Sequence, residues 1–161
     1  MIILGIDPGS RITGYGVIRV EGNRYHYIDS GCIRTDTKAT MAVRLHTIFQ
    51  GIDQSIGLYK PSVFSIEEVF MHKNPQSAII LGQARGVALC CAAMANLEVH
   101  EYAATRIKQT IVGRGHAEKT QVQAMVQHLL RLNSTPQADA ADALAAALTH
   151  AFHRKVERII Q

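Results

Sequence analysis

The pattern of hydrophobic positions predicts strands in the first third of the chain. Residues 2–6 form a continuous apolar run that stops at an Asp-Pro-Gly turn, which is typical of a central strand buried on both faces. Two more segments, 13–20 and 24–34, are rich in β-branched and aromatic residues, and a Glu-Gly-Asn turn joins them. Because short links connect the three segments, we expect an antiparallel meander.

Farther along the chain, apolar residues recur every three or four positions. This spacing predicts an amphipathic helix over residues 41–58, followed by a strand over 63–69 that the helical crossover makes parallel to the first. A long helix over 75–96, a short strand at 99–102 and helical segments to the end complete the order β-β-β-α-β-α-β-α-α. This order predicts an α/β fold with a mixed five-stranded sheet flanked by helices, and it resembles the ribonuclease H-like architecture.

Composition narrows the class of protein. The 161 residues are 47% hydrophobic and 19% charged, which indicates one globular domain over residues 1–161 and excludes two full-sized domains. The net charge of +4 permits a polyanionic partner. Three cysteines without a Cys-x-x-Cys pair favour free thiols in a reducing cytoplasm. The chain opens without a basic leader and lacks a run of about 18 uncharged apolar residues, so no membrane association is expected.

Four acidic side chains occur in apolar surroundings. Asp7 follows the first strand directly, and Glu67 lies near the end of the strand expected to pair with it. Ligands of open α/β sheets bind outside the carboxyl ends of the strands, so we expect these two carboxylates to meet. Asp139 and Asp142 lie three positions apart in an Ala- and Leu-rich helix, which places them about 60° apart on one face. A buried pair of this kind must be capped, paired or metal-bound, because an unpaired buried charge is very costly.

Each acid taken alone also has an ordinary structural explanation. Asp7 can cap the Pro-Gly turn, and Asp139 can interact with the N-terminal dipole of its helix. Glu67 and Glu68 alternate across the strand, so one of them faces solvent. Together the four acids favour a divalent cation, and oxygen ligands suit Mg²⁺ or Mn²⁺. Two such ions about 3.5–4 Å apart support in-line hydrolysis of a phosphodiester.

Six motifs extend the pattern over nearly the whole chain. They are I-L-G-I-D-P-G-S-R-I-T-G-Y-G-V-I at 3–18, I-E-E-V-F at 66–70, L-G-Q-A-R-G-V-A at 81–88, E-Y-A-A-T-R-I-K-Q-T-I-V-G at 101–113, A-E-K-T-Q-V at 117–122 and A-D-A-A-D-A-L-A at 138–145. In this order they resemble the motifs of RuvC-type Holliday junction resolvases. Several long matches in register are far more specific than a single Asp-x-Gly turn.

The resemblance implies a ribonuclease H-like, homodimeric, Mg²⁺-dependent endonuclease of recombination and repair. Such an enzyme makes paired, symmetric nicks in a four-way DNA junction and leaves 5′-phosphate and 3′-hydroxyl ends. The catalytic, metal-binding acids of the family fall on Asp7, Glu67, Asp139 and Asp142, and the family motif selects Glu67 over Glu68. The resemblance also implies two Mg²⁺ per subunit, with Mn²⁺ as a substitute, and a RuvAB branch-migration complex as partner.

Basic and aromatic residues in the matched motifs are expected to hold the DNA. Lys119 matches a family lysine beside the active site, where it can hold the scissile phosphate, although a lysine at a helix start is often only exposed. Lys108 matches a position near the DNA, and Arg114 flanks it. Arg85 is expected to bind DNA unless it forms a structural ion pair. Phe70 is expected to stack on a base near the crossover unless it is an ordinary core residue.

Other features of the sequence leave alternatives open. Small residues at helical spacing over 77–95 fall on the dimer helix of the family, so we expect a shared interface there. We expect His150 and His153 on a solvated helix face. A nucleotide phosphate site of the actin or hexokinase type is one rival function, but it needs two such domains. A junction-binding architectural protein is another, although clustered acids serve poorly in a surface that only holds phosphates.

Overall fold

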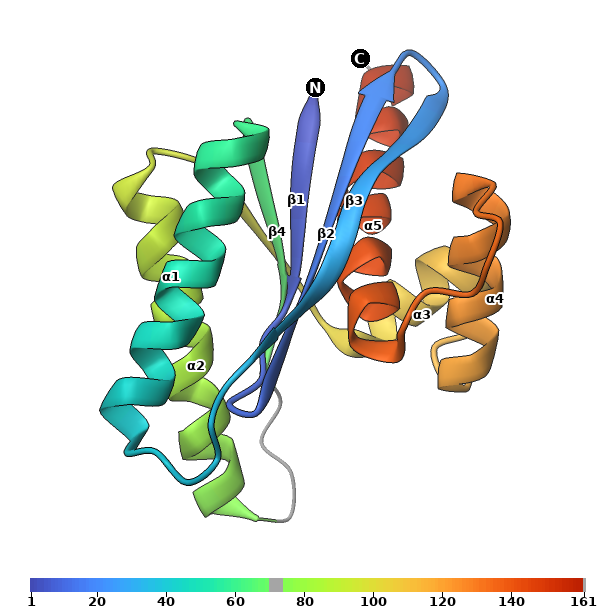
Figure 1. The fold of residues 1–161 in the computed structure, drawn as a ribbon. Helices are drawn as coiled ribbons and strands as arrows, with labels where there is room; N and C mark the ends of the chain where they lie inside the picture. The colour runs from blue at the N-terminus through green and yellow to red at the C-terminus, as the bar shows by residue number, and fades with distance from the viewer. Residues whose placement is uncertain (70–73, 161) are drawn as a thin grey trace.

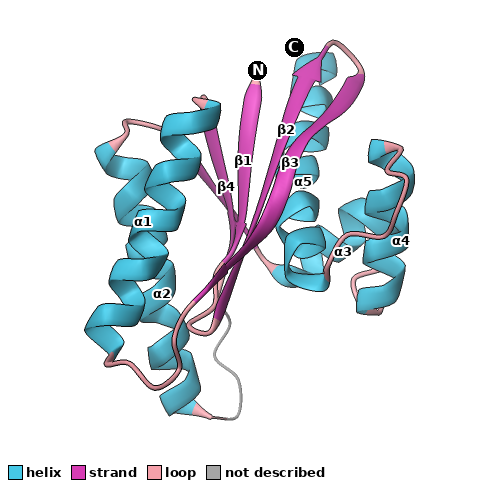
Figure 2. Cartoon of the chain, viewed as in Figure 1, coloured by secondary structure: helices cyan, strands magenta, loops and turns pink. Residues whose placement is uncertain are grey.

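Five strands form one mixed sheet in the order β3-β2-β1-β4-β5 (Figures 1 and 2). The computed structural model describes residues 1–69 and 74–160, with side chains as far as residue 156. The strands are β1 (Ile2–Asp7), β2 (Ile12–Glu21), β3 (Arg24–Arg34), β4 (Val63–Glu67) and β5 (Glu98–Tyr102). The first three pair antiparallel, whereas β4 pairs parallel with β1 and β5 pairs parallel with β4. The predicted sheet is confirmed, and the apolar run of β1 lies at its centre.

Helices cover both faces of the sheet (Figure 1). They are α1 (Met41–Tyr59), α2 (Pro75–Met94), α3 (Ala104–Val112), α4 (Lys119–Leu130) and α5 (Ala138–Ile160). One hydrophobic cluster joins the sheet to α1 and α2, and another joins its opposite face to the three later helices. The sequence order counted one helix too few after β5. Gly113, in the left-handed region at φ 84°, ends α3 and separates it from α4.

Helix α5 lies directly on β1 and β2 because glycines face it. A Cβ on Gly5 would lie 2.0 Å from the Ala143 carbonyl oxygen, and one on Gly14 would lie 2.0 Å from the Asp139 carbonyl oxygen. On the helix side, the contact is made largely by alanines that are fully buried. From β4, the buried Ser65 hydroxyl donates to the Ala146 carbonyl at 2.7 Å. This close approach fixes where the first turns of α5 sit relative to the end of β1.

Helix α2 is apolar enough, by length and composition, to cross a membrane. The helix has 20 residues, and a stretch of 18 of them has a mean hydropathy of 1.5 and is 22% buried. The sequence sign of a membrane span is about 18 consecutive uncharged apolar residues, and Arg85 interrupts such a run in this helix. Arg85 forms an ion pair with Glu101 of β5, and its Nε donates to the Glu67 carbonyl oxygen at 3.1 Å. Because α2 also packs against α1 over the sheet, we interpret it as a surface helix of this fold with one exposed apolar side.

Candidate active site

The carboxyl ends of two adjacent parallel strands bring the first two acids together. Ile6 of β1 is the register partner of Ile66 of β4, so Asp7 and Glu67 follow side by side at the ends of these strands. The first turn of α5 lies at the same end of the sheet (Figure 1). The approach of α5 to Gly14 places Asp139 there, and Asp142 follows one turn later.

A cleft of about 630 Å³ opens at this end of the sheet. We call it the acidic cleft, and its charged lining residues are Asp7, Glu67, Glu68, Lys108, Lys119 and Asp142. Asp139 lies beside this lining, close enough for its charge to act on Asp7 and on Asp142. Segments that are far apart in the sequence, from β1, β4, α3, α4 and α5, therefore contribute to a single site.

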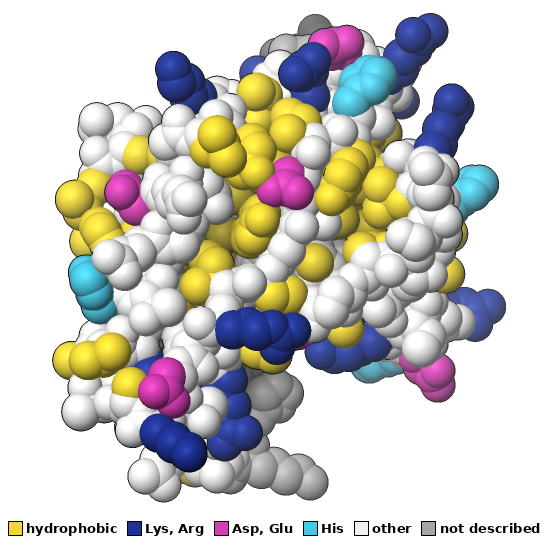
Figure 3. Space-filling model, viewed as in Figure 1, with side chains coloured by type: hydrophobic (Ala, Val, Ile, Leu, Met, Phe, Trp, Pro, Cys, Tyr) yellow, Lys and Arg dark blue, Asp and Glu magenta, His cyan; other side chains and the backbone are white. Residues whose placement is uncertain are grey.

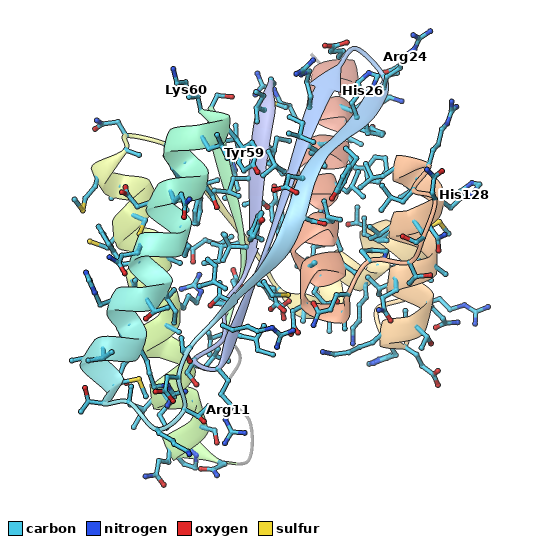
Figure 4. All side chains as sticks on the ribbon, viewed as in Figure 1. Arg11, Arg24, His26, Tyr59, Lys60 and His128 are labelled. Carbon is cyan, nitrogen blue, oxygen red and sulfur yellow. The ribbon has the colours of Figure 1, made fainter. Side chains whose placement is uncertain are left out.

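A larger groove of about 900 Å³ lies at the opposite end of the sheet, between the β2–β3 hairpin and the α4–α5 connection. Arg24, His26 and Arg131 are among its lining residues, and none of its described lining residues is acidic. In Figure 4, Arg24 and His26 lie at that end, whereas Arg11, in the β1–β2 turn, lies at the other. We assign the chemistry to the smaller, acidic cleft because carboxylates are the groups that hold hard cations.

The acids of the cleft disfavour one another's charge. Burial, followed by repulsion from Glu67, Asp142 and Asp139, raises the pKa of Asp7 to about 8, while Lys119 acts in the opposite direction. Burial and then the charge of Asp142 raise the pKa of Glu67. Burial also raises the pKa of Asp142, which Lys119 partly offsets. The site therefore holds protons, or a cation in their place, because its full negative charge is unfavourable in this setting.

Lys119 supplies positive charge at the rim of the cleft. Its Nζ lies 3.4 Å from Oδ2 of Asp142, and its side chain is 69% exposed. The position is set by a capping box at the start of α4, in which Glu118 and Gln121 exchange side-chain and backbone hydrogen bonds. The charge of Asp142 is the main cause that raises the pKa of Lys119, so its ammonium group stays charged at neutral pH.

The donor set suits a hard divalent cation. The coupled carboxylates supply oxygen ligands, and a bound cation would relieve the repulsion that raises the pKa of Asp7. Within residues 1–69 and 74–160, no three acidic, His or Cys side chains already converge in a coordinating geometry. Mg²⁺ does not require such a group, because it usually takes only one or two carboxylates and completes its shell with waters and substrate phosphates. The residues present therefore fit the ion.

The structure places the other predicted residues in different settings. Lys108 lines the cleft, and Arg114 is exposed in the α3–α4 loop. Arg85 is held in the ion pair with Glu101, which is the structural alternative considered for it, and its DNA contact stays a prediction. Phe70 lies outside the described residues. The expectation for His150 is wrong: it is 4% exposed, and its Nδ1 lies 2.9 Å from the Tyr102 hydroxyl.

Sequence reasoning missed Gln137, which precedes α5. Its side chain contacts Asp139 through two hydrogen bonds, and the sequence signal for it was only a polar residue next to the first turn of a helix. Reasoning from sequence also missed Gly14, whose signal was a glycine inside an otherwise β-branched strand. Both residues contact Asp139 or its backbone and help to fix its position.

Fold and site together define a nuclease domain of the ribonuclease H-like class. The family model "Crossover junction endodeoxyribonuclease RuvC" matches residues 3–150, and the chain belongs to this family. It is 61% identical over 150 residues to the crossover junction endodeoxyribonuclease RuvC of Marinobacter nauticus, covering 93% of this chain and 85% of that protein. It is 60% identical over 149 residues to that of Serratia proteamaculans, covering 92% and 86% of the two chains.

Solved structures agree with this assignment. The structure of T. thermophilus RuvC in complex with Holliday junction substrate superposes with a TM-score of 0.91 at 32% sequence identity, covering 98% of this chain and 96% of that one. A second structure of RuvC from Thermus thermophilus superposes with a TM-score of 0.88 at 32% sequence identity, covering 98% of this chain and 97% of that one. Family membership decides in favour of the nuclease over the nucleotide-binding and purely architectural alternatives.

Proposed function

We propose that this RuvC-family nuclease resolves four-way DNA junctions by hydrolysing one phosphodiester in each of two opposed strands, leaving 5′-phosphate and 3′-hydroxyl ends. The observation that carries the proposal is the acidic cleft, where three carboxylates from β1, β4 and α5 lie beside two lysines. The junction-bound T. thermophilus RuvC supports the choice of substrate.

Asp7, Glu67, Asp139 and Asp142 would hold two Mg²⁺ ions per subunit, and Mn²⁺ would substitute for them. The chemistry of the donor set and the raised pKa values of the buried acids support this assignment. Bound Mg²⁺ supplies positive charge that activates water and stabilises the leaving oxygen. The carboxylates of the chain fix where that charge sits, and their deprotonation accompanies loading.

Basic side chains around the cleft would hold the DNA backbone. The Lys119 ammonium group, whose Nζ lies 3.4 Å from Oδ2 of Asp142, would donate to the scissile phosphate. Lys108 lines the same cleft, the exposed Arg114 precedes the lining residue Gly115, and Arg11 is exposed in the β1–β2 turn. On the face drawn in Figure 3, Lys and Arg side chains lie at the lower end, where the β1–β2 turn is, and also along the upper edge. Such contacts position the duplex without reading its sequence.

A second copy of the chain would cover the exposed side of α2. Ile79 is 64% exposed and Met94 is 67% exposed on this helix. Gly82 and Gly86 lie one turn apart, and a Cβ on either would meet nothing within 4 Å, so a partner helix can approach closely. A two-fold dimer provides two related active sites for two strands. Ile79→Glu should yield monomers in sedimentation, and a persisting dimer would assign the interface elsewhere.

Family resemblance supports the remaining proposals, a RuvAB branch-migration complex as partner and a cytoplasmic location. The activity itself is tested with a synthetic four-way junction and a linear duplex of matched sequence, each with and without Mg²⁺. We expect paired nicks in the junction alone, and only with Mg²⁺. Equal cutting of the linear duplex, or cutting in EDTA, would contradict the proposal.

A further inference from the structure

Gln137 lies between the start of α5 and the carboxylate of Asp139. Its backbone carbonyl accepts from Ala141 N at 2.8 Å, and its side-chain Oε1 accepts from the backbone N–H groups of Asp139 at 3.1 Å and Ala140 at 3.3 Å. These bonds make Gln137 the N-cap of α5. Its Nε2 donates to Oδ2 of Asp139 at 2.9 Å, which a cap does not require.

The neighbours of the amide fix which way it points. The Cys32 thiol also donates to Oε1 of Gln137, at 2.7 Å, so three donors converge on the oxygen. The nitrogen must then face the Asp139 carboxylate, because an amide carries its acceptor and its donors at opposite ends. Burial and the charge of Asp139 raise the pKa of Cys32, which keeps the thiol protonated as a donor.

Three neighbouring strands of the sheet form the floor beneath the Gln137 amide. Asp7, Gly14 and Cys32 are register partners across β1, β2 and β3 and form one row. The Asp139 carbonyl lies against Gly14 in this row, while Cys32 at its outer end contacts Gln137. The carbonyl contact fixes the backbone of Asp139, but the carboxylate still has two free torsions. The hydrogen bond from Gln137 Nε2 restrains Oδ2.

We propose that Gln137 is a positioning residue, which orients the Asp139 carboxylate for the divalent cation. One oxygen of Asp139 accepts from the amide, so the other is left for the cation. Partners that orient metal ligands typically contribute tenfold to 100-fold in metal affinity. Because Gln137 is exposed to solvent, we expect an effect at the lower limit, about tenfold. The inference rests on the proposed role of Asp139 as a metal ligand.

Substitution by serine separates positioning from capping. Gln137→Ser retains a hydroxyl that caps α5 but cannot reach the Asp139 carboxylate, whereas Gln137→Ala loses both functions. The matched control is Gln127→Ala. Gln127 also bonds at both ends of its amide, to Leu132 and Thr135, but contacts no acid of the site.

The test is titration of the metal-free, full-length protein with Mn²⁺ alone, followed by calorimetry, together with thermal unfolding. We expect Gln137→Ser to bind Mn²⁺ about tenfold more weakly at an unchanged melting temperature. Gln127→Ala should keep its Mn²⁺ affinity. Junction cleavage by Gln137→Ser should need about tenfold more Mg²⁺ for half the maximal rate and recover at saturating Mg²⁺.

Two results would overturn the inference, and they differ from each other. Wild-type Mn²⁺ affinity in Gln137→Ser, with Mn²⁺ binding lost in Asp139→Asn, would reduce Gln137 to a helix cap and leave the metal site intact. Unchanged Mn²⁺ binding in Asp139→Asn would instead remove Asp139 from the metal site, and the positioning role would fall with it.

Discussion

Removing the charge of Asp7 should stabilise the metal-free protein while abolishing its chemistry. Burial and the neighbouring acids raise the pKa of Asp7 to about 8, so the folded protein holds a proton there that the unfolded chain releases. The folded pKa is raised, and the metal-free protein therefore loses stability as the pH rises from about 4 to about 8. Asp7→Asn is neutral in both states and escapes this cost.

The size of the effect follows from the same values. At pH 7, the difference of about 3.2 pH units from the ordinary pKa of 3.8, at about 1.36 kcal/mol per unit, sets an upper limit of about 4 kcal/mol. The asparagine amide also has to be desolvated, so we expect about 2 kcal/mol. In a chain of this length, that raises the melting temperature by about 4–8 °C.

The assay is urea and thermal unfolding in EDTA from pH 5 to 8. Asp36→Asn is the matched control, because Asp36 is exposed and its Oδ1 accepts from Lys38 N at 2.9 Å, which an asparagine oxygen can also do. We expect the control to change stability by less than about 0.5 kcal/mol. Saturating Mg²⁺ should stabilise the wild type but not Asp7→Asn. The reasoning is refuted if Asp7→Asn is no more stable than the wild type in EDTA, or if its stability advantage over the wild type does not grow as the pH rises from 5 to 8.

Three further predictions follow from packing, burial and charge. Gly14→Ala should lower the free energy of unfolding in urea by about 3 kcal/mol, because its Cβ would strike the Asp139 carbonyl. Gly57→Ala, which places a Cβ in open space on α1, should raise it by about 0.5–1 kcal/mol. Equal effects of the two substitutions would contradict the close approach of α5. Burial lowers the pKa of His150 to about 4, so wild-type stability should lose a contribution as the pH falls from about 6.5 to about 4, and a His150→Leu variant should lack that slope. Lys119→Ala should slow single-turnover cleavage about 100-fold while junction binding in Ca²⁺ stays near wild type, and an equal loss of both would restrict Lys119 to binding.

The strands and their order could be predicted because their signal is local. The apolar run before Asp7 has no polar interruption, and only a central strand buried on both faces satisfies it. The helix between Ala104 and Val112 was not resolved as separate, because it has nine residues and buries only two isoleucines. So short an apolar stripe carries little periodic signal.

The residues of the candidate site also fall into those that the sequence predicts and those that it does not. Acids in apolar segments are visible in the sequence, because a buried charge needs a partner or a cation. The contacts of Gln137 and His150 depend on Cys32 and Tyr102, which lie 105 and 48 positions away in the chain, and no local pattern reports such pairs. The ion pair that holds Arg85 is likewise set by the placement of β5 next to β4.

The most direct test of the acidic cleft is single-turnover cleavage of a four-way junction by Asp7→Asn in Mg²⁺, with junction binding measured in parallel in Ca²⁺. The account predicts that cleavage is lost while the junction is bound with wild-type affinity. Cleavage at a rate near that of the wild type would show that the carboxylates of β1, β4 and α5 do not form the hydrolytic site.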